Sequence, residues 1–314
     1  MQVVRICDFR SDTVLKKLSM FLAVTTMVVT LSACGNKSSS KDSSGKLKVV
    51  VTFNAMREFA EAVGKDKVEV ETIIPEGTEP HDFEPKARDM QSLNNDQIFI
   101  YNGFGMEAWV DNALEAVGNN KLISVDASKG STAIKNTDPE LVKADGQNDP
   151  HLWLSLKGAE NQSKNIKDAF VKADPANKAY YEKNYLDFYN KLEVLYKEYD
   201  TKFSSLTNKT FVTGHAAFAY LAKDFGLKQN SVEDVFADGE PSGKRLKSLT
   251  DYCKENKIKT IFVEDMVSPK VSETLAKEVG ATTKKIYTLE SQEDNKDYLE
   301  SMKDNLERLY ISLR

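Results

Sequence analysis

Apolar and polar positions alternate along the chain in two recurring ways from residue 47 onward. Short runs rich in β-branched and aromatic residues, as in 47–53 and 97–101, are followed by longer stretches with apolar residues every three or four positions. The first pattern is typical of buried strands and the second of amphipathic helices. Because strands separated by helices pair in parallel, the sequence predicts an α/β fold with parallel sheets.

This alternation occurs twice, which predicts two lobes. The strands expected in the first lobe are 47–53, 68–74, 97–101 and 122–125, and its helices are 55–63, 86–94, 106–117 and 156–172. The second lobe has expected strands at 210–213, 260–263 and 285–289, and expected helices at 215–225, 244–256, 268–279 and 296–309. Each lobe should therefore hold a small parallel sheet flanked by helices.

One long helix is predicted between the lobes. Residues 176–205 contain no Gly or Pro, and Asp174-Pro175 in front of them is a helix-start signal. Its apolar stripe consists of Tyr181, Tyr185, Phe188, Leu192, Leu195, Tyr199 and Phe203. A helix of this length spans roughly 45 Å, which is longer than one small lobe needs. We expect a first lobe at 47–175, a linking helix at 176–205 and a second lobe at 206–314.

The first residues have the pattern of an export signal. Two lysines precede the apolar run 18–31, which ends in small residues before Cys34. The run is shorter than the ~20 residues that span a bilayer, so we predict a signal peptide at 1–33. A start codon assigned upstream of the true one would explain the unusual segment 1–15.

The cysteine at the predicted cleavage point resembles that of a bacterial lipobox. This resemblance implies that Cys34 is lipidated and anchors the chain to the outer face of the cytoplasmic membrane. Residues 34–46, rich in Ser, Lys and Gly, are then expected to form a flexible tether. An ordinary secreted protein with a cysteine at this place by chance is the alternative.

Composition and cysteine usage narrow the function further. The net charge of −5 is spread without long runs of one sign, which argues against a nucleic-acid partner. Once Cys7 is removed with the signal and Cys34 is lipidated, only Cys253 is left, so the mature chain can form no internal disulfide. We expect Cys253 to act as a small apolar residue of a helix.

The chain has only three histidines, each located where a loop meets a regular element. His81 lies in GTEPHDFEP, His151 in NDPHLWLS and His215 in VTGHAAFAYLA. Taken singly, each is more simply a solvated or inert surface residue. The similar settings of all three favour a shared metal ion. His81 and His215 follow predicted strands, and ligands of parallel α/β sheets bind at the carboxyl ends of strands.

A carboxylate would complete such a site. Glu290 follows the predicted strand 285–289, and Glu240 and Glu264 are weaker candidates. Three imidazoles and one carboxylate suit Zn²⁺, and the set would draw two ligands from each lobe.

The neighbours of these residues are expected to play supporting roles. Asp82, Glu84 and Asp149 are expected to be solvated or to orient imidazoles. The aromatic residues Trp153 and Phe218 are expected to pack in the core.

Six motifs in order carry a resemblance to a known family. They are GTEPHDFEP, NGFGMEAWV, DPHLWLS, VTGHAAFAYLA, GEPSGKRL and FVEDMVSPKVSETLAKEVGA. From about residue 47 to the C-terminus the chain resembles the zinc- and manganese-binding lipoproteins of ABC importers, the cluster A-I solute-binding proteins. The resemblance implies two α/β lobes joined by a rigid helix, a metal at their interface, and delivery to a membrane permease driven by a cytoplasmic ATPase.

Within that family, the third and fourth ligands distinguish zinc from manganese members. Manganese types tend to have Glu and Asp there, whereas zinc types have His in the third place, as at His215 here. The segment IYTLESQ resembles the zinc-type LNPLES, which implies that Glu290 is the fourth ligand. Two features differ from the zinc-type pattern: residues 131–150 contain no histidine, and Thr288 replaces the usual proline.

The sequence therefore predicts an extracytoplasmic lipoprotein, expected to be monomeric, that captures Zn²⁺ for an ABC permease. The same receptor role for Mn²⁺ is the nearest alternative. From other classes, a secreted zinc hydrolase and a metal-stabilised adhesin remain open. The chain lacks HExxH and has no closely spaced pair of His, which disfavours the hydrolase. We expect no enzymatic activity.

Overall fold

The computed structural model describes residues 45–136, 148–237, 241–265 and 268–314. The predicted signal peptide at 1–33, Cys34 and Glu240 lie outside these residues. Among the described helices, none combines the length and the hydropathy needed to cross a membrane.

The first lobe is built on a four-stranded parallel sheet, as the sequence predicts. Its strands β1 (Leu47–Val51), β2 (Val68–Thr72), β3 (Ile98–Tyr101) and β4 (Ile123–Asp126) lie in the order β2-β1-β3-β4. Apolar residues fill the central strands β1 and β3, because both faces of a parallel sheet are covered. The edge strand β2 alternates between buried or half-buried residues and exposed ones.

Three helices of this lobe lie close to their predicted ranges. They are α2 (Asn54–Gly64), α3 (Ala87–Asn95) and α6 (Leu156–Ala173). Single 3-10 turns, η1 (Lys65–Lys67) and η2 (Leu152–Leu154), precede β2 and α6. The helix expected at 106–117 is limited to α4 (Val110–Ala116). The prediction was too long at its start, since residues 106–109 form a bend and a turn that follow the positive-φ residues Gly103, Phe104 and Gly105.

The second lobe repeats the same strand order. Its strands β5 (Thr210–Thr213), β6 (Lys228–Ser231), β7 (Thr260–Val263) and β8 (Thr282–Lys285) lie in the parallel order β6-β5-β7-β8. Helices α8 (Ala219–Asp224), α9 (Gly243–Glu255), α10 (Pro269–Val279) and α11 (Tyr298–Leu313) complete it.

Three predictions for this lobe were wrong. The edge strand β6 was missed because its sequence KQNS is polar and buries only its last residue. The strand expected at 285–289 ends at Lys285, and the apolar residues beyond it are buried by packing rather than by sheet pairing. The helix expected at 215–225 begins only at Ala219, because residues 214–218 form the loop that presents His215.

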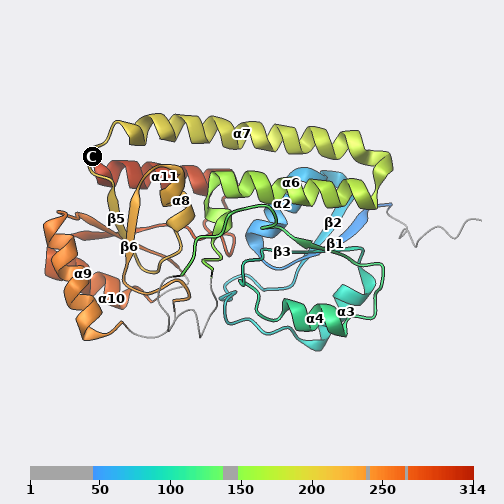
Figure 1. Ribbon diagram of the computed structural model, residues 1–314, viewed down its shortest axis with the longest axis horizontal. Helices are drawn as coiled ribbons and strands as arrows, with labels where there is room; N and C mark the ends of the chain where they lie inside the picture. Colours follow the sequence, from blue (N-terminus) through green and yellow to red (C-terminus); the bar gives the residue numbers. More distant parts are fainter. Residues whose placement is uncertain (1–44, 137–147, 238–240, 266–267) are drawn as a thin grey trace, which may run out of the picture. The chain divides into compact units, whose positions relative to one another are not determined.

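The predicted long helix joins the two sheets. After the 3-10 turn η3 (Pro175–Asn177), α7 runs from Lys178 to Ser204 over 27 residues. Figure 1 shows α7 beside α6 and α11, and its predicted apolar positions face these helices, with Tyr181, Leu192 and Phe203 fully buried. Because one packed surface extends from the first lobe to the second, α7 connects both sheets to a common core.

The main hydrophobic core extends across both lobes. It joins β1, β3, α2, α6 and α7 to residues late in the chain, among them Ile286, Leu289, Tyr298 and Met302. A smaller cluster, which includes Cys253 as a buried apolar residue, lies between β5, β7, α9 and α10. The segment that carries Glu290 is therefore packed into the larger core, although it follows the second sheet in sequence.

Candidate metal centre

The structure brings together the four predicted ligands from four separate segments. One ligand atom each of His81, His151, His215 and Glu290 lies within 4.8 Å of all the others. Two atoms bound tetrahedrally to one Zn²⁺ are separated by about 3.3 Å. The Nε2 atoms of His81 and His151 are 3.2 Å apart, which suits two imidazoles directed at one ion.

His81 lies in the loop between β2 and α3. Its backbone N–H donates to Glu79 Oε1 at 3.2 Å, and its ring contacts the rings of His151 and Phe236. The side chain is 5% exposed. Burial, with the nearby His151 and His215, holds the pKa of His81 well below its ordinary value. The ring is therefore neutral at physiological pH and able to coordinate.

His151 is oriented by Asp149. The carboxylate oxygen Oδ1 accepts from the backbone N–H and from Nδ1 of His151, both at 2.9 Å. Because Nδ1 donates its proton there, the lone pair of Nε2 is directed toward His81 and the other ligands. Burial keeps the pKa of His151 well below its ordinary value and raises the pKa of Asp149 to about 7.

His215 immediately follows Gly214 at the carboxyl end of β5. Its Nδ1 is 3.6 Å from Glu264 Oε1, which is an ion-pair contact rather than a hydrogen bond, and Nε2 is left for a ligand role. Burial favours the neutral ring, but the neighbouring Glu264, with Glu290 and Glu79, outweighs burial and raises the pKa of His215 to about 9.

Glu290 is buried, and it lies five positions beyond the end of β8 rather than directly after a strand. Its Oε2 accepts from the hydroxyl of Thr288 at 2.8 Å, and its Oε1 has no hydrogen-bond partner among the described residues. Burial, with the nearby Glu79 carboxylate, raises the pKa of Glu290 to about 8. The Thr288 hydroxyl thus helps to orient the Glu290 carboxylate.

The buried polar atoms around the site suit a cation. Within the described part of the chain, His81 Nδ1, His215 Nδ1, Glu264 Oε2 and Glu290 Oε1 are buried without a hydrogen-bond partner. Such atoms are costly unless something else neutralises them. A divalent cation between the imidazoles and Glu290 would pull His215 into its neutral form and compensate the buried carboxylates.

The structure also shows what the other predicted residues do. Asp149 orients an imidazole as expected, whereas Asp82 and Glu84 are exposed. Glu264, a rival candidate ligand in the sequence, contacts His215 instead of joining the four-residue cluster. Trp153 and Phe218, which were expected to pack in the core, are both buried.

Sequence reasoning missed Glu79 as a neighbour of the site. Its Oε1 lies 4.0 Å from His81 Nε2, and its side chain is 26% exposed. Its position two residues before His81 was the only signal available in the sequence.

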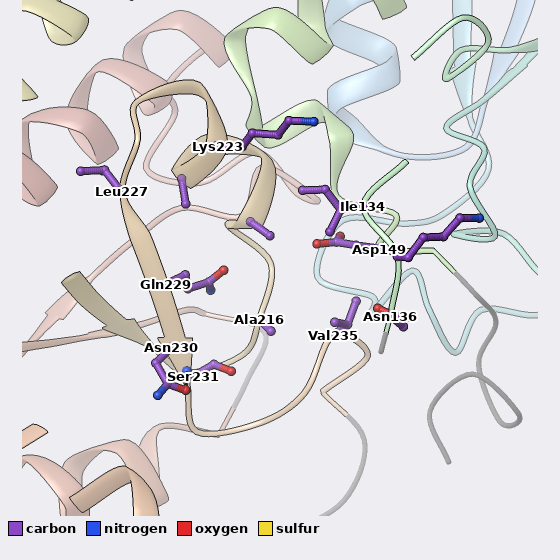
Figure 2. A pocket seen from close by; sticks show the side chains of 13 residues that line it. Ile134, Asn136, Asp149, Ala216, Lys223, Leu227, Gln229, Asn230, Ser231 and Val235 are labelled. Atoms are coloured by element: carbon purple, nitrogen blue, oxygen red, sulfur yellow. Dashed lines mark hydrogen bonds between the residues drawn. The ribbon is translucent and has the colours of Figure 1, made fainter. Parts of the chain in front are cut away.

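A cavity of about 470 Å³ lies next to the cluster but is not part of it (Figure 2). Asp149 and Ala216, neighbours of two predicted ligands, contribute to its wall together with Gln229 and Lys223. None of the four predicted ligands lines it. The ligand atoms of the cluster lie within 4.8 Å of one another, a spacing that suits a single ion.

Comparison with known proteins identifies the family. The profile of ZnuA, the periplasmic component A of zinc-uptake complexes, matches residues 49–311. The chain belongs to this family. The resemblance predicted from the six motifs is thereby confirmed, and so is the fold of two parallel sheets joined by a long helix.

Individual relatives of the ZnuA family cover almost all of the chain. The high-affinity zinc uptake system protein ZnuA of Bacillus subtilis is 40% identical over 313 residues, 95% of this chain and 98% of that protein. The zinc-binding lipoprotein AdcA of Streptococcus pneumoniae is 36% identical over 94% of this chain, which spans 60% of AdcA.

A solved structure shows the same architecture. The laminin-binding protein Lmb of Streptococcus agalactiae, described as a bifunctional protein with adhesin and metal transporting activity, is 35% identical. It matches with a TM-score of 0.79 over 86% of this chain and all of that chain.

Proposed function

We propose that the chain is an extracytoplasmic receptor that captures Zn²⁺ and delivers it to an ABC permease for import. The observation that carries this proposal is the buried cluster of three imidazoles and one carboxylate within 4.8 Å. In this proposal His81, His151, His215 and Glu290 are the metal ligands. Membership of the ZnuA family supports the same role.

The chemistry of the ligands favours zinc over manganese. Imidazole suits Zn²⁺, whereas Mn²⁺ prefers sites rich in carboxylate and water oxygen. His215 stands in the third position, where a second carboxylate would favour Mn²⁺. Zinc is thus the proposed cargo and Mn²⁺ the runner-up.

The residues around the cluster would prepare it for a cation. Asp149 fixes the ring of His151, so that one imidazole is already oriented before the ion arrives. Since His81 and His151 are neutral, they can bind without losing a proton, whereas the raised pKa values of His215 and Glu290 mean that these two groups release protons as the ion binds. Burial of all four side chains would exclude water from the bound ion.

A closed set of four ligands also favours capture over catalysis. Catalytic zinc sites have three protein ligands and an open position for water, whereas four ligands fill a tetrahedral shell. We therefore propose a receptor rather than a hydrolase.

The attachment and partners of the chain are proposed from the same family. Cys34 would carry the lipid anchor on the outer face of the cytoplasmic membrane, with 34–46 as the tether. The receptor would act as a monomer and meet a permease that is driven by a cytoplasmic ATPase. We further propose 47–175 and 206–314 as the two lobes and 176–205 as their link.

Growth under zinc limitation tests the transport role. A bacterial strain that lacks its own zinc receptor but retains the matching permease would be given the full chain, His81→Ala or Cys34→Ser. The full chain should restore growth, His81→Ala should not, and Cys34→Ser should restore it less well. Equal rescue by His81→Ala would contradict the proposal.

A further inference from the structure

The backbone that carries Glu290 is hydrogen-bonded to the first lobe at three successive carbonyls. The oxygen of Thr288 accepts from Trp153 Nε1 at 2.7 Å. The oxygen of Leu289 accepts from Asn54 Nδ2 and that of Glu290 from the Asn54 backbone N–H, both at 3.3 Å. Two residues of the first lobe therefore hold the segment on either side of the predicted fourth ligand.

This segment needs such support, because its backbone is strained. Leu289 has a φ of 59°, in the left-handed region that a leucine seldom adopts. Strain of this kind persists only where surrounding contacts enforce it. The hydrogen bonds to the carbonyls of Thr288 and Leu289 hold the backbone directly before and at the residue with positive φ.

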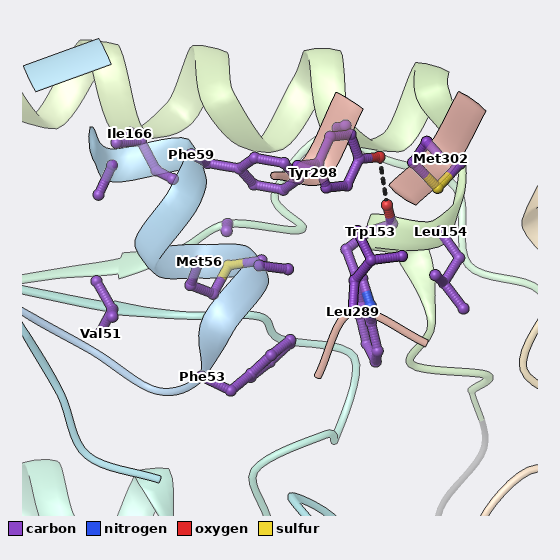
Figure 3. Close-up of a cluster of buried hydrophobic side chains, with 14 of the residues drawn as sticks. Val51, Phe53, Met56, Phe59, Trp153, Leu154, Ile166, Leu289, Tyr298 and Met302 are labelled. Atoms are coloured by element: carbon purple, nitrogen blue, oxygen red, sulfur yellow. Dashed lines mark hydrogen bonds between the residues drawn. The ribbon is translucent and has the colours of Figure 1, made fainter. Parts of the chain in front are cut away.

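Asn54 is itself firmly placed. It is the first residue of α2, is 2% exposed, and lies at the carboxyl end of β1. Its Oδ1 accepts from Arg57, and Nδ2 also donates to Glu58 Oε1 at 3.0 Å. Its neighbours Phe53 and Met56 pack in the same cluster as Trp153 and Leu289 (Figure 3).

A second pair of contacts ties the Glu290 segment to the loop of His81. Gly77 N–H donates to Ser291 Oγ at 2.8 Å, and Gln292 N–H donates to Glu76 Oε2 at 2.6 Å. The loops of the first and fourth predicted ligands thus exchange hydrogen bonds. Glu290 comes late in the sequence but is mounted on the first lobe.

We propose that Asn54 is a positioning residue for Glu290, its side chain acting through the Leu289 carbonyl to aim the carboxylate at the metal. This inference rests on the proposed zinc site. Asn54 does not belong to the ligand cluster, so its contribution to zinc affinity should depend entirely on Glu290.

A double-mutant cycle tests this dependence. Zinc affinity would be measured by competition with a chromophoric chelator for the wild-type chain, Asn54→Ala, Glu290→Gln and the double variant. In the wild-type background Asn54→Ala should lower affinity about tenfold, as loss of a ligand-orienting contact commonly does. In the Glu290→Gln background it should lower affinity little, because the carboxylate is already gone.

The visible spectrum of bound Co²⁺ separates positioning from a merely structural role. If Asn54 aims Glu290, Asn54→Ala should shift the Co²⁺ spectrum toward that of Glu290→Gln. Asn184→Ala is the matched control, since buried Asn184 donates to the Val63 carbonyl at 3.0 Å, at the far end of α2. It should lower the melting temperature of the metal-free chain without changing affinity or spectrum.

The outcomes distinguish this inference from the proposed function. No measurable zinc binding by the wild-type chain would overturn both. Tight wild-type binding with an unchanged Asn54→Ala, or with an equal loss in both backgrounds, would overturn the positioning role alone. If Asn54→Ala does not fold, Asn54→Leu replaces it in the cycle, because leucine is similar in size and lacks the donor to the Leu289 carbonyl.

Discussion

His215 and Glu290 are the two predicted ligands that titrate near neutral pH. In the metal-free site the pKa of His215 is raised to about 9 by Glu264 and its acidic neighbours against the effect of burial, and burial raises that of Glu290 to about 8. This pair therefore holds a proton at pH 7 that a bound cation must displace. A histidine with the ordinary pKa of about 6.5 would already have lost most of its protons at pH 7.

We expect zinc binding at pH 7 to release about one proton or more, and affinity to fall as pH decreases from about 9, where His215 begins to take up its proton. The sign follows because protons compete with the metal for His215 and Glu290. Calorimetry in buffers of different ionisation enthalpy measures the released protons. An affinity that is flat between pH 8 and pH 6, with no proton release, would contradict the assignment of these two ligands.

Gly214 leaves space for the carboxylate that faces His215. A Cβ at this position would overlap Glu264 Oε2, and the Glu264 side chain is fully buried with little freedom to move. We expect Gly214→Ala to displace Glu264 and lower zinc affinity about tenfold, by the same reasoning as for other contacts that orient ligands. Gly243→Ala is the control, because a Cβ there meets nothing within 4 Å. Equal affinities for the two variants would show that Glu264 does not support His215.

At the scale of elements, the contact between η2 and α6 sets the position of His151. A Cβ on Gly158, in the first turn of α6, would overlap the backbone oxygen of Leu152, the residue after His151. Gly158→Ala should therefore push η2 away from α6, costing about 1–3 kcal/mol of stability, and should also weaken zinc binding. Denaturant unfolding of the metal-free chain measures the first effect, with Gly118→Ala as control, because a Cβ there would make only an ordinary contact with Asn94 Oδ1 at 3.6 Å. Unchanged stability would mean that this contact is looser than the structure shows.

The regular elements could largely be predicted from sequence because most are amphipathic or fully buried. The strand β6 could not, since an edge strand with the sequence KQNS carries no apolar signal. Residues 286–289 gave a false strand signal, because burial in a core of helices selects the same apolar residues as burial in a sheet.

Some residues of the candidate site could likewise be predicted from the sequence and others could not. The three histidines could be found because the chain has no others. Asn54 could not, since it contacts backbone carbonyls more than two hundred positions away, and such contacts leave no pattern in the sequence.

At the scale of the whole molecule, folding should not depend on the metal. The larger core joins both lobes through α7 and α11, and the four predicted ligands are not among its members. We expect the metal-stripped chain to remain folded, with an unchanged far-ultraviolet circular dichroism spectrum. Zinc at about 100 times its Kd should add about 2.7 kcal/mol of stability by linkage. Unfolding on chelation would instead indicate a structural metal, as in a metal-stabilised adhesin.

The central claim is that His81, His151, His215 and Glu290 form one site selective for zinc. Titration of the metal-stripped chain with Zn²⁺ and with Mn²⁺, alongside His215→Ala and Glu290→Ala, tests it most directly. We predict one Zn²⁺ per chain, weaker binding of Mn²⁺, and a loss of zinc affinity of about 100-fold or more for His215→Ala, since a direct ligand should matter at least as much as an orienting contact. Preference for Mn²⁺, or unchanged zinc affinity in the His215→Ala variant, would contradict it.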